Sequence, residues 1–219
     1  MNNFPSKDLV LKSIKTGLEN AKNNFTHWTS DELALSFAPP KFLTIHISQE
    51  LAKLEFPPEI YIDASVSDIL RCSLPNRDDY KTFMKNKGLS QDIVHLTLDE
   101  RFSHQNDNDS VSRVIMTVQN GIRNVQDEYT KEIDKMCKMI DRTKKEDSTL
   151  DYAVFTFYMD ISNRARKKSA RRLNEIIDSF DEVVQKYKTL ESNFEGGDVT
   201  IVENTGEWCF GYYIIEPKF

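Results

Sequence analysis

Apolar residues recur every three or four positions over residues 6–54, as they do on one face of an α-helix. Val10, Ile14 and Leu18 show this spacing clearly. Two proline pairs interrupt the pattern, because proline breaks the interior of a helix. The pattern therefore predicts three successive helices, at residues 6–25, 29–37 and 40–54.

Short runs of β-branched and aromatic residues predict strands in the middle and at the end of the chain. Residues 92–98 and 113–119 are expected to pair as a hairpin around a polar connection at 99–111. Residues 152–159 are almost continuously apolar, which predicts a central strand covered on both faces. The other predicted strands are residues 59–63, 199–202 and 208–215.

Helical spacing returns at residues 127–140 and 162–190, where two longer helices are expected. Antiparallel strands combined with a crossover helix indicate an α/β or α+β fold, with a mixed central sheet flanked by helices. We expect an N-terminal helical extension over residues 1–38 and an α/β domain over residues 39–219.

The composition is that of a folded protein with a slightly acidic balance. The 219 residues carry a net charge of −6, which argues against a dedicated, high-affinity nucleic-acid binder but allows a local basic patch. Three widely separated cysteines do not indicate a disulfide framework or a zinc site. The sequence shows no apolar run long enough to span a bilayer and no signal-peptide pattern, so a cytoplasmic location without a membrane partner is expected.

Positive charge is concentrated in residues 163–172, which we call the basic segment. Six of its ten residues are basic, and cations at a helix start oppose the helix dipole. The interpretation is a patch that contacts phosphates or an acidic partner, and the alternative is a solvated helix start. No aromatic residues are interleaved, so the segment itself does not indicate stacking with bases. The basic residues are Arg164, Arg166, Lys167, Lys168, Arg171 and Arg172.

The order helix, three strands, helix, strand resembles the PD-(D/E)XK, or restriction-endonuclease-like, superfamily. Residues 40–51 are similar to the opening helix of bacterial proteins with this core, and residues 92–94 look like their metal-binding strand. Residues 113–120 look like the strand that in the family reads apolar-Glu-apolar-Lys-Asn. The resemblance covers residues 30–160 and implies a restriction-endonuclease-like core.

In that family an Asp and a Glu hold one divalent ion, usually Mg²⁺, and a Lys two residues further on lies on the same strand face. Asp92 matches the Asp, whereas Thr117 stands at the Glu position and Gln119 at the Lys position. The resemblance therefore implies a degenerate catalytic site, with Asp92 as a weak metal ligand and either no cofactor or Mg²⁺.

Some members of the family carry a catalytic residue on a neighbouring element. The best candidates for such relocated ligands are Glu50 on the opening helix and Asp63 on the first strand. The alternative is that Glu50 and Asp63 are solvated surface residues with no role as ligands. The remaining charged candidates are Lys53, Asp99, Glu100 and Arg113.

Three hypotheses about function follow. The first is a non-catalytic nuclease-like protein that binds a protein partner or nucleic acid, in the restriction or anti-phage setting that the resemblance implies. The second is an active Mg²⁺-dependent nuclease with relocated catalytic residues. The third is a structural or oligomerisation module that uses only the sheet edge and the long helices. The aromatic segment 208–219 is expected to be core and edge strand, and the alternative is an exposed aromatic edge through which a homo-oligomer forms.

Overall fold

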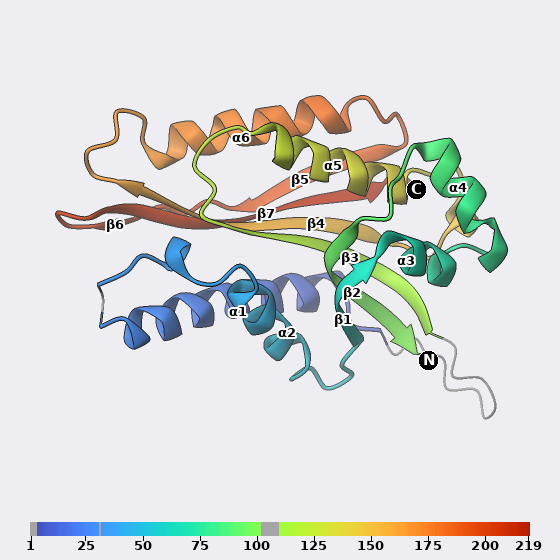
Figure 1. Cartoon of the computed structure of the whole chain (residues 1–219), viewed down its shortest axis with the longest axis horizontal. Coiled ribbons are helices and arrows are strands. Elements are labelled where there is room, and N and C mark those ends of the chain that lie inside the picture. The colour runs from blue at the N-terminus through green and yellow to red at the C-terminus, as the bar shows by residue number, and fades with distance from the viewer. Residues whose placement is uncertain (1–3, 31, 102–109) are drawn as a thin grey trace.

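A mixed sheet of seven strands forms the centre of the protein (Figure 1). The computed structural model describes residues 4–30, 32–101 and 110–219. The strand order is β1-β2-β3-β4-β7-β5, and β6 also pairs with β7. The strands are β1 (Glu59–Ser65), β2 (Ile93–Arg101), β3 (Ser110–Asn120), β4 (Tyr152–Ser162), β5 (Leu190–Gly196), β6 (Thr200–Val202) and β7 (Gly206–Pro217).

Helices cover both faces of the sheet, which confirms the predicted fold class. The helices α1 and α2 lie on one face, and α5 and α6 lie on the other, as Figure 1 shows. The helical elements are α1 (Lys7–Trp28), α2 (Phe42–Leu51), α3 (Val66–Ser73), α4 (Tyr80–Lys87), α5 (Asp127–Ile140) and α6 (Ser169–Val184), with the short 3₁₀ turns η1 (Leu35–Phe37), η2 (Arg77–Asp79) and η3 (Lys145–Asp147).

The strand directions determine which loops meet. The predicted hairpin of β2 and β3 is antiparallel, as is the pair β1 and β2. The strand β3 is parallel to β4, and the helix α5 connects them. Because parallel strands end at the same edge, the segments that follow β3 and β4 leave the sheet side by side.

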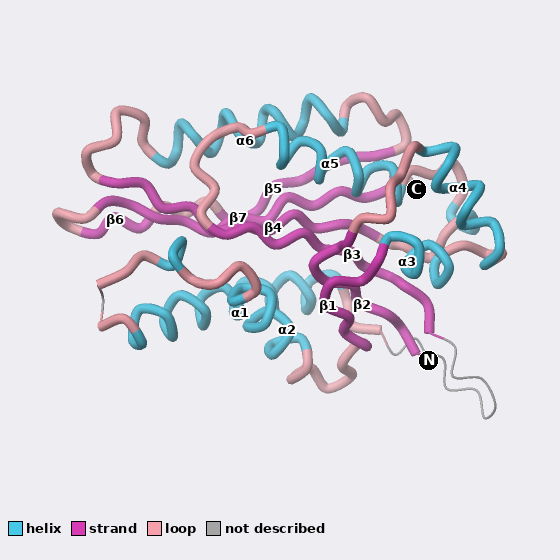
Figure 2. Tube along the Cα trace, viewed as in Figure 1, coloured by secondary structure: helices cyan, strands magenta, loops and turns pink. Residues whose placement is uncertain are grey.

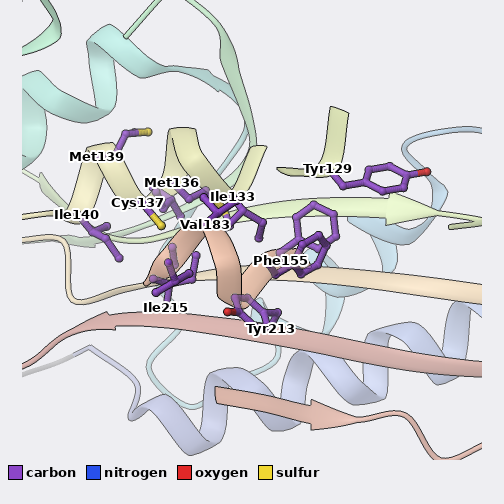
Figure 3. Packing of buried hydrophobic residues seen from close by; sticks show 14 of the residues in the cluster. Tyr129, Ile133, Met136, Cys137, Met139, Ile140, Phe155, Val183, Tyr213 and Ile215 are labelled. Atoms are coloured by element: carbon purple, nitrogen blue, oxygen red, sulfur yellow. The ribbon is translucent and has the colours of Figure 1, made fainter. Parts of the chain in front are cut away.

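The strand β4 has the double-sided burial that its apolar run predicts. Phe155 and Phe157 face the cluster under α5 and α6, whereas Val154 and Tyr158 face the cluster under α1 and α2. Figure 3 shows side chains of α5 packed over Phe155 and the strand β7. A hydrophobic core therefore lies on each side of the sheet.

The helix α1 is part of the second core. Val10 and Ile14 are fully buried in the same cluster as Leu96 of β2. At Gly17 a Cβ atom would lie 2.6 Å from Cα of Ile47 in α2, so the two backbones are in close contact. The hydrophobic cluster on this face thus contains residues of the expected N-terminal extension, 1–38, and of the expected α/β domain, 39–219.

Three local predictions were wrong. The helix expected at 29–37 is reduced to the 3₁₀ turn η1, and Asp31 lies outside the described residues. The helix expected at 162–190 begins only at Ser169, because β4 continues to Ser162 and Asn163 donates a backbone hydrogen bond to Thr205. The strand β5 was not predicted, since its edge position leaves it with few apolar residues.

The polar connection of the β2–β3 hairpin is shorter than expected on both sides. The strand β2 extends to Arg101 and β3 starts at Ser110, while residues 102–109 lie outside the described residues.

In the part of the chain that the structure describes, no helix has the length and apolar character needed to cross a bilayer.

Candidate functional site

The strand β3 separates its side chains between the two faces of the sheet. Val114 and Met116 belong to the cluster under α1 and α2, whereas Thr117 is fully buried on the side of α5. The Oγ1 atom of Thr117 donates a hydrogen bond to Oε2 of Glu132, over 3.1 Å. Gln119, two residues further along, is half-buried.

Asp92 lies immediately before β2 and is exposed. Its carboxylate accepts a hydrogen bond from Ser90, and its backbone carbonyl accepts one from the backbone NH of Val66 at 2.9 Å. Among the described residues, no hydrogen bond joins Asp92 to Thr117 or Gln119. The three predicted catalytic positions therefore do not share a hydrogen-bond network.

Two residues of α5 that the sequence did not single out lie beside Thr117. Lys135 donates to Oε1 of Glu132 at 2.8 Å and to the carbonyl of Ile93 at 2.9 Å. The available signal was the spacing of Glu132 and Lys135 by three residues, which places them together on a helix. A carboxylate thus reaches Thr117 from the helix, but it arrives already paired with a cation.

The two preferred relocated ligands have partners elsewhere. Glu50 accepts a hydrogen bond from Asn20 at 2.9 Å and forms an ion pair with Lys53. Because α2 covers the opposite face of the sheet, the sheet separates Glu50 from Thr117. Asp63 forms an ion pair with Lys41 and has a positive φ of 57°.

The other charged candidates lie on the hairpin of β2 and β3. Burial raises the pKa of Asp99 to about 6, with the Glu59 charge acting in the same direction and a hydrogen bond from Ser112 opposing it. Glu100 is buried and accepts a hydrogen bond from Nε of Arg113 at 2.7 Å. Glu100 and Arg113 therefore compensate each other's charge inside the protein.

The residues at the predicted catalytic positions do not fit a magnesium site. Mg²⁺ prefers several oxygen ligands, among them one or two carboxylates. Around Thr117 the structure provides one carboxylate, Glu132, and Lys135 already neutralises it. Within the described ranges, no three His, Cys, Asp or Glu side chains are grouped so that they could hold a metal ion.

A groove of about 800 Å³ opens where β4 ends and β7 begins. Its lining comes from α1, residues 32–35, the segment after β3, the end of β4 and the start of α6. Figure 2 shows loops from these parts of the chain gathered at this end of the sheet. In open α/β sheets, ligands bind in the crevice outside the carboxyl ends of parallel strands, and β3 and β4 end here.

Aromatic rings form one wall of this groove. The ring centres of Tyr158 and Trp208 are 6.3 Å apart, and Phe210 packs edge-on against Trp208 at 5.2 Å. The Nζ atom of Lys22 lies over the Trp208 ring, 4.8 Å from its centre. Burial raises the pKa of Tyr158, and the charge of Asp160 adds to this effect, so the phenol stays protonated.

Two acidic residues of the groove have partners within the protein. Asp160 accepts hydrogen bonds from Arg123 at 3.1 Å and from Ser36 at 3.0 Å. Glu207 accepts a hydrogen bond from the backbone NH of Ser169 at 2.8 Å and so caps the start of α6. These carboxylates are compensated internally, so they oppose an anion less strongly than free carboxylates would.

The basic segment forms part of the border of this groove. A helix was predicted for the whole segment, but residues 163–168 are not helical because α6 begins at Ser169. Arg172 and Ala165 line the groove. Arg172 is held in place by hydrogen bonds to the carbonyls of Arg123 at 2.8 Å and Lys167 at 2.9 Å. Arg164 and Arg166 flank Ala165 in the sequence and are exposed.

The six basic residues differ in their charge compensation. Lys167 and Arg171 both pair with Glu175, at 2.9 and 3.3 Å. Lys168 donates to the carbonyl of Asn163 at 3.0 Å and meets no carboxylate within the described residues. Arg164 and Arg166 are exposed, and among the described residues neither side chain has an ion-pair partner.

Comparison of the chain with protein-family models finds no matching family, and comparisons with curated proteins and with solved structures find no match either.

Proposed function

We propose that this chain is a non-catalytic nuclease-like protein that binds nucleic acid through the basic segment at the rim of the groove. The observation that carries the proposal is the pair of exposed arginines, Arg164 and Arg166, which lack carboxylate partners among the described residues. Arginines of this kind neutralise phosphates and release counterions, which drives binding to nucleic acid.

The order and direction of the elements support the nuclease-like part of the proposal. The helix α2 is followed by the antiparallel strands β1, β2 and β3, with the helices α3 and α4 inserted between β1 and β2, and then by the helix α5 and by β4 parallel to β3. This is the plan helix, three strands, helix, strand that the sequence resembles. The restriction or anti-phage setting is part of the proposal and rests on that resemblance alone.

The polar bridge beside β3 supports the non-catalytic part. Thr117 and Gln119 stand where the family pattern has two charges, and Glu132 is bound to Lys135. For an active nuclease with relocated residues, Glu132 would have to leave its ion pair with Lys135 and bind a metal cation instead.

The net charge of −6 limits the type of binding that is expected. Repulsion from the rest of the surface reduces the attraction of a single basic patch. We therefore expect moderate affinity that decreases steeply with salt, and contacts confined to this end of the sheet.

Fluorescence anisotropy with labelled single-stranded DNA, single-stranded RNA and duplex DNA tests the proposal. The double variant Arg164→Ala/Arg166→Ala is expected to bind at least about fivefold more weakly than the wild type at low salt. Its matched control is Lys144→Ala/Lys145→Ala, which removes two exposed cations just before the amino end of β4, whereas the groove opens at the carboxyl end of that strand. Equal affinity of the two variants would reject the proposal.

Exposed apolar side chains favour a protein partner as a second candidate. Trp28 at the end of α1 and Phe37 in η1 are 67% and 68% exposed, and Ile201 on β6 is 78% exposed. Such side chains are typical of contact surfaces. Self-association through these side chains is tested by sedimentation analysis of the wild type and of Phe37→Ser and Ile201→Ser. A wild-type dimer that both variants dissociate would support it, and a monomeric wild type would exclude it.

A further inference from the structure

We infer that the groove receives one unpaired base of a single-stranded nucleic acid, stacked on the Trp208 indole, while the basic segment holds the flanking phosphates. This inference rests on the proposed function and adds the form of nucleic acid and the residue that recognises it. It depends on the groove that Trp208 lines together with Ala165 and Arg172 of the basic segment, which the sequence alone does not show.

The Trp208 ring is positioned as a stacking surface. It is half-buried at the start of β7, and Tyr158 and Phe210 pack against it, so its orientation is fixed. The ring lines the groove. A rigid aromatic side chain at the edge of a cavity is the arrangement that single-strand binding proteins use for bases.

Lys22 shows that the Trp208 ring attracts positive charge. Its ammonium group lies 4.8 Å from the ring centre, over one face. Lysine is long and flexible, so a base that takes this face moves the ammonium group aside without moving the backbone. The displaced cation is then free to pair with a phosphate of the same strand.

The size and the lining of the groove suit a nucleotide. A volume of about 800 Å³ lies within the usual range for small-molecule sites. Thr26 and Thr205 line the groove and provide hydroxyl groups for the polar edge of a base. Arg172 lines the same groove, and the exposed Arg164 and Arg166 flank Ala165, which also lines it. A duplex keeps its bases stacked inside, so it offers no free ring to Trp208.

Intrinsic fluorescence tests the stacking directly. The sequence contains two tryptophans, so Trp28→Phe leaves Trp208 as the single emitter. Trp28 is 67% exposed and contacts the Phe42 ring, which phenylalanine can also do. Titration of this variant with oligo(dT) and with oligo(U) is expected to quench the emission of Trp208 in parallel with the anisotropy change. The DNA and RNA arms show which sugar is preferred.

Affinity measurements give the second readout. Trp208→Ala is expected to bind oligo(dT) or oligo(U) about tenfold more weakly, and Trp208→Phe is expected to lose less because it keeps a ring. Circular dichroism shows whether each variant is folded, and Lys22→Ala tests the same site without altering the core. For Lys22→Ala we expect a loss of about twofold to fivefold, as for one phosphate contact.

The outcomes separate this inference from the proposed function. Binding that depends on Arg164 and Arg166 but leaves the emission of Trp208 unchanged would overturn the inference and leave the proposed function in place. Tighter binding of a duplex than of single strands would also overturn the inference. A failure of the wild type to bind any of these nucleic acids would overturn both.

Discussion

The hydroxyl of Thr117 on β3 donates a 3.1 Å hydrogen bond to the carboxylate of Glu132 on α5. This contact lies where the resemblance to nucleases implies a catalytic carboxylate. The same carboxylate forms an ion pair with Lys135, whose side chain is only 11% exposed. A polar bridge between the strand and the crossover helix therefore lies at the position where the nuclease pattern has a metal ligand.

A double-mutant cycle measures this bridge. Thr117→Val and Glu132→Ala are each expected to lower the free energy of unfolding by about 1 to 2 kcal/mol. Thr117→Val removes a hydrogen bond to the half-buried carboxylate of Glu132, and Glu132→Ala leaves the buried hydroxyl of Thr117 and the ammonium group of Lys135 without this partner. In the double variant the two effects should be less than additive, with a coupling of about 1 kcal/mol. Urea unfolding checks this, with Glu128→Ala on the same helix as an exposed control. Fully additive losses would show that the bridge does not contribute to stability.

Metal binding is expected to be absent at this position. Calorimetric titration with Mg²⁺ and with Mn²⁺ should show no saturable binding, because Glu132 would have to give up Lys135 to act as a ligand. Incubation of DNA or RNA with either ion should leave the nucleic acid intact. Cleavage by the wild type that Asp92→Ala or Glu132→Ala abolishes would instead establish the active nuclease.

The buried carboxyl of Asp99 predicts a pH dependence of stability. Burial raises its folded-state pKa from 3.8 to about 6, so the folded state retains a proton that the unfolded state loses. The stabilisation from this proton is complete below pH 3.8 and is lost as the pH rises through about 6. At pH 7 Asp99→Asn, which needs no proton, should be more stable than the wild type by about 2 to 3 kcal/mol.

The difference between Asp99→Asn and the wild type isolates this group from all other titrations. Unfolding free energies measured from pH 4 to pH 7 should diverge as the pH rises. A constant difference for Asp99→Asn would contradict the buried, protonated carboxyl.

The close contact of α1 with α2 predicts that the N-terminal helix is essential for the fold. Gly17→Ala places a methyl group 2.6 Å from Cα of Ile47, so the helices must separate, at a cost of about 1 to 3 kcal/mol. Asn23→Ala, at an exposed position of the same helix, should be nearly neutral. Thermal unfolding checks both, and a Gly17→Ala variant as stable as the wild type would show that α1 packs loosely.

The periodicity of the sequence was sufficient to predict much of the sheet. The strands β2, β3 and β4 follow from alternating or continuous apolar residues, and the crossover helix α5 follows from its helical spacing. The edge strand β5 escaped prediction because it lies at the margin of the sheet and carries polar residues. The helix was predicted to begin at residue 162, but it begins at Ser169. The sequence could not show this, because the backbone of Asn163 is bound by Thr205, a partner distant in the sequence.

The candidate site was predictable only in part. Local charge density identified the basic segment, and strand parity placed Thr117 on one face of the sheet. Neither could show that Glu132 fills the space beside Thr117, since that contact depends on how α5 packs on the sheet. The pairing of Lys22 with Trp208 joins the first helix to the last strand and becomes visible only in the folded chain.

The salt dependence of binding to single-stranded nucleic acid tests the central claim most directly. If the basic segment contacts phosphates, the logarithm of the association constant should fall linearly with the logarithm of the salt concentration. The double variant Arg164→Ala/Arg166→Ala should show a slope shallower by about 1 to 1.5, which corresponds to two lost phosphate contacts. A slope identical to that of the wild type, or binding that does not respond to salt, would contradict the account.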